Sequence, residues 1–106
     1  MKPWSPAAPH RPACPHRRLA RLIARALPPE LALGESRPRP WASANFVGAR
    51  HLFACTAADG AAAPPRRALQ NRLSRMDWAL PGHIVADIAV EADDEGLRIE
   101  VLTVEE

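Results

Sequence analysis

Apolar residues recur at helical spacing in two stretches of this chain. In residues 16–27 they fall three and four positions apart, with arginines on the opposite side, which is typical of an amphipathic helix. The apolar stripe of this stretch consists of Leu19, Leu22, Ile23, Ala26 and Leu27. The stripe of the second stretch, residues 66–80, consists of Leu69, Leu73, Met76 and Leu80. Because Pro28 and Pro81 follow directly, the sequence predicts two helices that end before these prolines.

Residues 41–56 alternate between the two sides with a period of two, which is typical of strands with one buried face. We predict a β-hairpin here, with a two-residue turn at 48–49 that has glycine in its first position. This turn sets Phe46 opposite His51 and creates one nearly apolar face. The face consists of Ala42, Ala44, Phe46, His51, Phe53 and Cys55. The alternative is a helix over 49–59, closed by the glycine that follows it.

Residues 83–106 predict a second hairpin. Its first strand places four residues on one face, namely Ile84, Ala86, Ile88 and Val90. Its second strand does the same with Leu97, Ile99, Val101 and Thr103. A helical stripe over 84–92 is the alternative. The β-branched residues favour the strand, and acidic residues at the end of such a helix would oppose its dipole.

The register of this second hairpin follows from its loop. A four-residue loop at 93–96 sets Val90 opposite Ile99 and Glu91 opposite Arg98, which is a favourable cross-strand pair. A shift by one residue would turn the apolar set toward solvent. We therefore expect this register to be well specified.

Three segments are expected to connect or flank these elements. Residues 28–40 are rich in proline and predict a linker, and residues 57–65 predict a loop of small residues. In residues 1–15 proline stands at every third position, as in a polyproline II helix, and we predict a disordered arm. Residues 12–17 also fit the PxxPxR shape that aromatic-lined grooves accept. The remaining residues, 16–106, then form a single small domain.

The predicted fold class is α+β, with the element order α-β-β-α-β-β. Two hairpins can join into one four-stranded antiparallel sheet, and both helices then cover its apolar face. The order of the strands is not determined by the pattern. One edge strand is expected to be exposed, and a homodimer joined through it is a reasonable expectation.

Charge is distributed unevenly along the chain, although the net charge is only +2. Residues 1–75 hold 13 of the 14 Lys and Arg residues, whereas residues 76–106 hold 9 of the 12 Asp and Glu residues. Parts of opposite sign attract each other within one molecule or between copies, and a basic surface attracts anionic partners.

Several observations bear on the compartment. No secretory segment follows Met1, no run approaches 18 apolar residues, and two cysteines cannot form a disulfide framework. The bias toward Ala, Arg and Pro is typical of a GC-rich bacterial coding sequence. We therefore predict a cytoplasmic protein with reduced thiols and no membrane span.

A His-x-x-x-Cys spacing occurs twice, at 10–14 and at 51–55. On a helix these side chains would be neighbours, about 6 Å apart, and could share a metal. In a strand they lie about 13 Å apart, at roughly 3.3 Å per residue. In polyproline II the span is about 12 Å. Because these two geometries are predicted here, we expect no metal site and no cofactor, and we expect Cys55 to be a small buried hydrophobe.

Catalytic signatures are weak. His83, Asp87 and Glu91 share a face, but on a strand they spread over about 26 Å, at roughly 3.3 Å per residue, and act separately on a solvated face. No serine lies in a Gly-x-Ser-x-Gly elbow; the serines are Ser5, Ser36, Ser43 and Ser74. Neither a phosphate loop nor a dinucleotide motif is present. The sequence therefore does not favour an enzyme.

Arginines on the two predicted helices are the candidate binding residues. The rows at 17–25 and 66–75 contain Arg17, Arg18, Arg21, Arg25, Arg66, Arg67, Arg72 and Arg75. If the helices lie side by side, these rows form one basic surface for an anionic partner. The preferred hypothesis is a non-enzymatic protein-binding or assembly module with an unknown partner or a second copy. The alternative is a nucleic-acid-binding accessory protein that uses the arginine rows.

Overall fold

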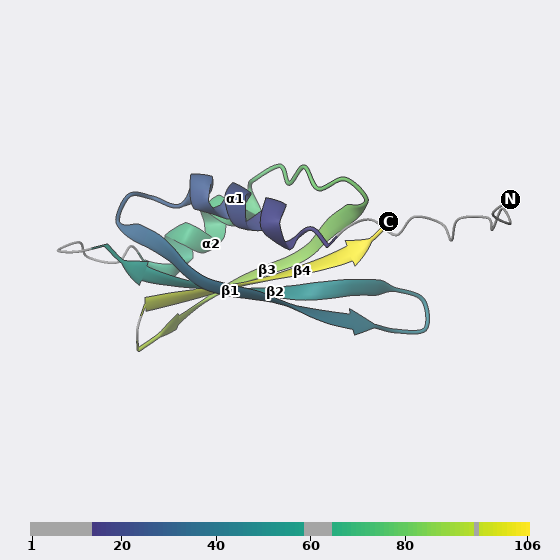
Figure 1. Ribbon diagram of the computed structural model, residues 1–106. Helices are drawn as coiled ribbons and strands as arrows, with labels where there is room; N and C mark the ends of the chain where they lie inside the picture. The colour runs from purple at the N-terminus through teal and green to yellow at the C-terminus, as the bar shows by residue number, and fades with distance from the viewer. Residues whose placement is uncertain (1–13, 59–64, 95) are drawn as a thin grey trace, which may run out of the picture.

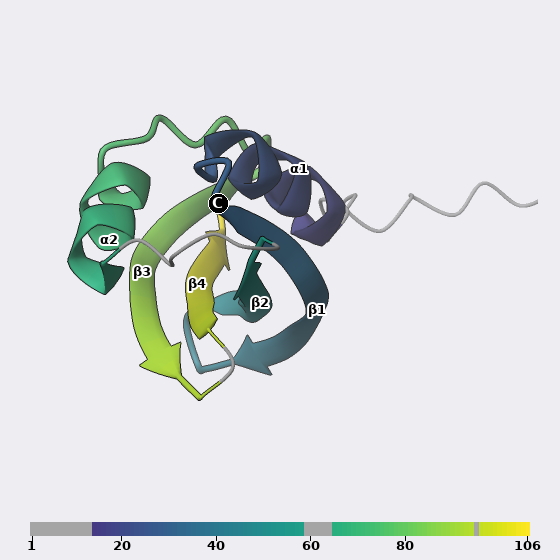
Figure 2. The same ribbon diagram turned by 90° about the vertical axis from the view of Figure 1, so that its left-hand side faces the viewer.

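The computed structural model describes residues 14–58, 65–94 and 96–106, and it confirms the predicted α+β fold (Figure 1). The elements are α1 (His16–Ala26), β1 (Leu31–Ala42), β2 (Val47–Ala57), α2 (Arg66–Ser74), β3 (His83–Asp93) and β4 (Gly96–Glu105). The four strands form one antiparallel sheet in the order β1-β2-β4-β3. Both helices lie on the same face of this sheet (Figure 2). The arm predicted over 1–15 lies outside the described residues up to residue 13, and so does the middle of the loop predicted over 57–65.

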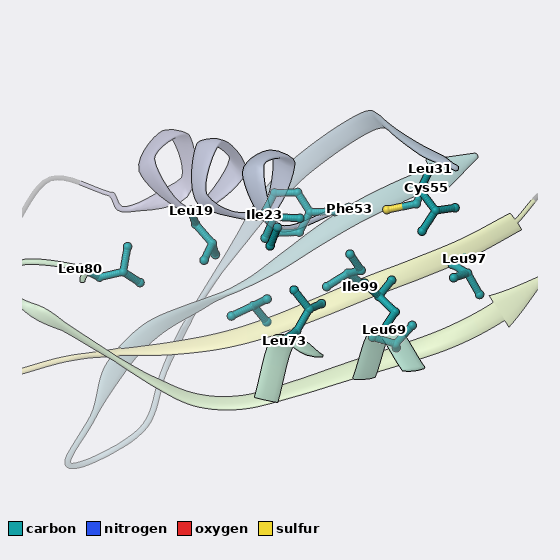
Figure 3. Close-up of a cluster of buried hydrophobic side chains, with 13 residues drawn as sticks. Leu19, Ile23, Leu31, Phe53, Cys55, Leu69, Leu73, Leu80, Leu97 and Ile99 are labelled. Carbon is teal, nitrogen blue, oxygen red and sulfur yellow. The ribbon is translucent and has the colours of Figure 1, made fainter. Parts of the chain in front are cut away.

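The core lies between this covered face and the helices. Leu19 and Ile23 of α1 are fully buried and lie on the side of the helix that faces the sheet, with Ile23 beside Phe53 of β2 (Figure 3). On the same face of the sheet, Leu69 and Leu73 of α2 pack into the same cluster. The helical stripes predicted from the sequence are thus confirmed as core positions.

The second helix is shorter than predicted, because it ends at Ser74 and not at residue 80. Its last turn tightens to three-residue hydrogen bonds, in which the amides of Arg75 and Met76 donate to the carbonyls of Arg72 and Leu73. The chain then runs on without helical structure, and Leu80 still reaches the core.

The linker predicted over 28–40 is wrong, because β1 occupies residues 31–42. Among the residues that the structure describes, β1 pairs only with β2 and is therefore an edge strand. A strand with one neighbour needs only every second amide for its ladder, and proline is tolerated where the amide would face outward. Pro38 and Pro40 lie two positions apart, so both can occupy such outward positions.

The turn predicted at 48–49 is also wrong. The hairpin closes between Ala42 and Val47, where the amide of Ser43 donates to the carbonyl of Phe46 over 2.8 Å. Phe46 is consequently 57% exposed, and the predicted pairing of Phe46 with His51 does not occur. Gly48 lies inside the sheet, where a Cβ would overlap the carbonyl oxygen of Thr103.

The predicted inner face of β2 is nevertheless confirmed. His51, Phe53 and Cys55 are buried, and residues 51–55 are strand and not helix. Alternation along a strand does not depend on which turn closes it, so the error in the turn left this face unchanged.

The register of the second hairpin is confirmed. Val90 pairs with Ile99, and Glu91 pairs with Arg98. The strands extend further than predicted, to a closing pair of Asp93 and Gly96. Gly96 has a φ of 148°, and a Cβ there would overlap the carbonyl oxygen of Cys55, so glycine is required at this position.

A β-bulge between Val85 and Asp87 changes the start of β3. The extra residue reverses the alternation, so that Val85 pairs with the buried Thr103 on the covered face. Ile84 is therefore 52% exposed, contrary to its predicted place with Ile88. The solvated face predicted for His83, Asp87 and Glu91 is wrong for His83 alone, because the bulge leaves His83 buried while Asp87 and Glu91 are exposed.

Candidate functional site

The predicted arginine rows lie on the two helices, and all eight side chains are exposed. The helix α1 contacts β1, whereas α2 contacts β3, so the rows are carried on opposite sides of the covered face (Figure 2). Two of these arginines make hydrogen bonds within the fold. Arg18 Nε donates to the carbonyl of Ala79 over 2.7 Å, and Arg66 donates to that of Val90 over 3.1 Å. A shared anion-binding surface stays a prediction.

A pair of histidines joins the first residue of α1 to the inner face of β2. His16 Nδ1 and His51 Nδ1 lie 2.9 Å apart, and the two rings are inclined by only 20°. Ring faces of parallel rings approach to about 3.5 Å. The shorter nitrogen contact therefore indicates rings that meet edge to edge, where an N–H points at a lone pair.

The histidine pair belongs to a longer chain of hydrogen bonds. At its outer end, Ser36 Oγ of β1 lies 3.0 Å from His16 Nε2. At its inner end, His51 Nε2 lies 2.8 Å from Thr103 Oγ1 of β4. The Thr103 hydroxyl in turn donates to the carbonyl of Ala49 over 3.4 Å. We call the four side chains of Ser36, His16, His51 and Thr103 the histidine relay.

The direction of every bond in the histidine relay follows from its inner end. A carbonyl only accepts, and a threonine hydroxyl has one hydrogen. If Thr103 donates to Ala49, Thr103 must accept from His51 Nε2–H, which leaves His51 Nδ1 as an acceptor. His16 then donates through Nδ1–H, and its Nε2 lone pair accepts the hydrogen of Ser36.

Burial keeps both histidines neutral. Burial lowers the pKa of His16, and it lowers the pKa of His51 to about 4, with smaller contributions from the charges of His16 and His83. Phe53 stacks on the His16 ring, with centroids 5.1 Å apart and the planes inclined by 3°. The ring of His16 is therefore held by hydrogen bonds in its plane and by Phe53 against its face.

Within residues 14–58, 65–94 and 96–106, no group of three or more His, Cys, Asp or Glu side chains is arranged to hold a metal ion. Burial raises the pKa of the Cys55 thiol to about 11, so this thiol stays protonated. Cys14 is an exposed free thiol. Among the same residues, no helix combines the length and apolarity that a membrane crossing requires.

The second feature is the open face of the sheet, on the side away from the helices (Figure 1). Residues paired in register share a face and form rows across the strands. The row that we call the apolar row consists of Trp41, Gly48, Val104 and Ile84. The next row, called the charged row, consists of Arg39, Arg50, Leu102 and Asp87. Within the charged row, the basic residues thus lie on β1 and β2 and the acidic residue on β3.

Two ion pairs cross the open face. Arg50 lies 2.8 Å from Glu100, and Arg98 lies 2.6 Å from Glu91. The second pair is exposed, and the Glu91 carboxylate raises the pKa of Arg98 through a hydrogen bond and its charge. A hollow of about 610 Å³ is lined from both sides of the sheet, by Leu52 of the open face and by Ser36 and Phe53 of the covered face.

The free edges of the sheet are protected differently. On β1, the prolines at 38 and 40 remove amides from the outer side. On β3, the side chain of Gln70 in α2 binds the edge as a neighbouring strand would. Its amide donates to the carbonyl of Ile88 over 2.7 Å, and its oxygen accepts from the amide of Val90 over 2.7 Å.

Comparison with known proteins finds no matching family model, no matching curated protein and no matching solved structure. From the sequence, His51 is expected on the inner face of a strand, and it meets His16 only within a metal site that is not expected to form; a hydrogen-bonded pair of these histidines is not predicted. The available signal was that His51 and Thr103 are polar residues on otherwise apolar inner faces, where each requires a hydrogen-bond partner.

Proposed function

We propose that the protein is a protein-binding or assembly module whose partner is a second copy of the same chain, bound through the open face. The observation that carries this proposal is the arrangement of the apolar and charged rows. Each row begins on β1 and ends on β3 with complementary chemistry. We also propose that this assembly takes place in the cytoplasm.

The protected edges favour the face over an edge as the interface. A strand-to-strand dimer requires a run of free amides and carbonyls along an edge. Pro38 and Pro40 interrupt such a run on β1, and Gln70 occupies the equivalent groups of β3. Edge pairing, one of the two modes expected from the sequence, is thus the less suitable one.

A two-fold axis parallel to the strands makes the open face complementary to itself. Such an axis reverses the order of the strands in the second copy. It leaves the position of each row along the strand direction unchanged. Arg39 then faces Asp87 of the second copy in the charged row. In the apolar row, Trp41 faces Ile84. Two sheets that pack face to face keep their strands within about 30° of each other, so these rows stay close.

The area of the face is adequate for a weak to moderate dimer. Four strands about 4.8 Å apart and about ten residues long, at roughly 3.3 Å per residue, cover roughly 600 Å². Stable interfaces bury about 800 Å² per partner, and weaker ones bury less. We therefore expect association that depends on protein concentration.

A charge exchange tests this geometry. Arg39→Asp and Asp87→Arg should each weaken dimerisation by about tenfold or more, because each sets like charges opposite each other. The double variant should restore association, since it recreates the pair with opposite polarity. Sedimentation velocity over a concentration series measures the dissociation constant.

Arg21→Asp is the matched control, because this exposed arginine lies on α1, away from the open face. It should leave dimerisation unchanged. A wild-type protein that stays monomeric at every concentration, or a double variant no better than the single ones, would overturn the proposal. Nucleic-acid binding by the arginine rows stays a prediction, and loss of such binding in Arg21→Asp would support it.

A further inference from the structure

The histidine relay ends at a serine hydroxyl that is open to solvent. We infer that Ser36 is a nucleophile that accepts acyl groups from small activated carboxylic esters, with His16 as its general base. His51 and Thr103 are positioning residues for His16. This activity is separate from the proposed dimerisation, because the relay lies on the covered side of the sheet.

The distances match those that nucleophilic catalysis requires. Ser36 Oγ lies 3.0 Å from His16 Nε2, and a catalytic base must lie about 2.6–3.2 Å from the proton that it removes. The base in turn is oriented by a third group, as in other activated serines. Here that group is His51, whose Nδ1 accepts the Nδ1–H of His16 over 2.9 Å.

The relay also gives His16 the correct tautomer. General-base catalysis needs a lone pair on the nitrogen that faces the serine, and therefore a hydrogen on the other nitrogen. The carbonyl of Ala49 at the inner end sets this arrangement through Thr103 and His51. Burial lowers the pKa of His16, so this ring is neutral and able to accept a proton at neutral pH.

The reaction proceeds in two balanced steps. In the first, a bond forms between Ser36 Oγ and the acyl carbon, the ester C–O bond breaks, and the serine proton moves to His16 Nε2. An alcohol leaving group takes that proton, whereas a phenolate leaves as the anion and His16 then releases the proton to solvent. In the second step, His16 removes a proton from water, the water oxygen bonds to the acyl carbon, and Ser36 Oγ leaves and recovers a proton.

A fluorophosphonate probe provides the direct test. Ser36 Oγ would bond to phosphorus while fluoride leaves, and mass spectrometry would locate the adduct. We expect one adduct, on Ser36, and a burst of nitrophenolate from 4-nitrophenyl acetate. Ser36→Ala should abolish both signals. Ser74→Ala is the matched control, since Ser74 is an exposed serine on α2 whose hydroxyl accepts a hydrogen bond from the side chain of Gln70, and it should react as wild type.

The base and the positioning residues have separate readouts. His16→Gln should lower the rate of labelling at least about 100-fold, because glutamine cannot take the proton. Thr103→Val should lower the rate and shift the ¹⁵N signals of His51 and His16 to the opposite tautomers, and Thr103→Ser should restore both. The labelling rate should fall as pH drops and His16 protonates. The groups that face His16 are Ser36, His51 and Phe53, while His83 acts on His51 through its charge.

Circular dichroism of each variant checks that the fold is retained. An adduct that persists in Ser36→Ala, no adduct in the folded wild type, or an unchanged labelling rate in folded His16→Gln would overturn the inference. The dimer result is independent of these outcomes. Arg39→Asp should leave labelling intact, and Ser36→Ala should leave sedimentation intact, so that failure of one proposal is distinguishable from failure of the other.

Discussion

The β3–β4 hairpin closes at Asp93 and Gly96 with a register that its own alternation specifies, whereas the β1–β2 hairpin closes at Ala42 and Val47 after a strand that contains two prolines. Both hairpins belong to the same sheet, but different contacts specify them. The register of the first follows from its own residues and one obligatory glycine, although Gln70 of α2 also binds its outer edge. The second is held by groups from elsewhere, above all by α1, which places His16 against His51 and Phe53.

This difference indicates where stability depends on tertiary contacts. The β1–β2 hairpin should be sensitive to changes in the buried cluster under α1. The β3–β4 hairpin should be sensitive to its closing glycine and tolerant of changes in its surface pairs. Four changes test this comparison.

The largest effect is expected for Phe53→Ala in β2. Phe53 is fully buried, packs among core residues and stacks on His16. Its truncation should lower the free energy of unfolding by about 3–5 kcal/mol, through lost burial and the cavity left behind. Denaturant unfolding measures the change. Phe46→Ala is the control, because Phe46 is mostly exposed in the turn, and it should stay within about 0.5 kcal/mol of wild type.

Gly96→Ala should be the most damaging change in the β3–β4 hairpin. Alanine at a φ of 148° is strained, and its Cβ would overlap the carbonyl oxygen of Cys55. We expect a loss of about 3 kcal/mol in the free energy of unfolding. Gly34→Ala is the control, because its Cβ meets only ordinary contacts, with the nearest atom 3.5 Å away. Equal losses in both variants would contradict the requirement for glycine at 96.

Acidification should destabilise the β1–β2 side specifically. The pKa of His51 is about 4 in the fold and about 6.5 when unfolded, so the unfolded state binds more protons between these values. The free energy of unfolding is therefore constant above about pH 6.5 and falls as the pH drops toward 4. Solvent also reaches the partly exposed His16 that lies beside His51. We therefore expect the free energy of unfolding to fall by about 2 kcal/mol, which is less than the shift of the His51 pKa alone would give.

Chemical denaturation across this pH range measures the loss. The dependence should largely disappear in His51→Phe, which removes the titrating group. A wild-type protein whose stability is flat between pH 4 and 6.5 would contradict the burial of a neutral His51.

The smallest effect is expected for Glu91→Gln on the open face. The ion pair of Glu91 with Arg98 is exposed, and such pairs contribute little because water screens them. Thermal unfolding should show a midpoint close to that of wild type. A large loss would mean that the register of β3–β4 depends on this pair and not on the apolar alternation.

Much of the fold could be predicted because its elements follow local rules. The stripe of Leu19 and Ile23 defined α1, and the alternation around Ile99 defined β4 with its partner. β1 could not be predicted, because proline is tolerated in a strand at the edge of a sheet and is excluded only when both sides of the strand need hydrogen bonds. The sequence does not show which strand lies at the edge. The bulge at Ala86 could not be predicted either, because one inserted residue leaves no recognisable change in the alternation of apolar and polar residues.

The sequence by itself determined the two helical stripes, the inner face of β2 and the register of β3–β4, because each depends on side chains a few positions apart. Tertiary structure alone decided that a proline-rich segment forms an edge strand. It also decided that Ser36, His16, His51 and Thr103, which lie on four different elements, meet in one relay. The physical reason is that hydrogen bonds between distant segments depend on how the elements pack, and that packing leaves no periodic signal in the sequence.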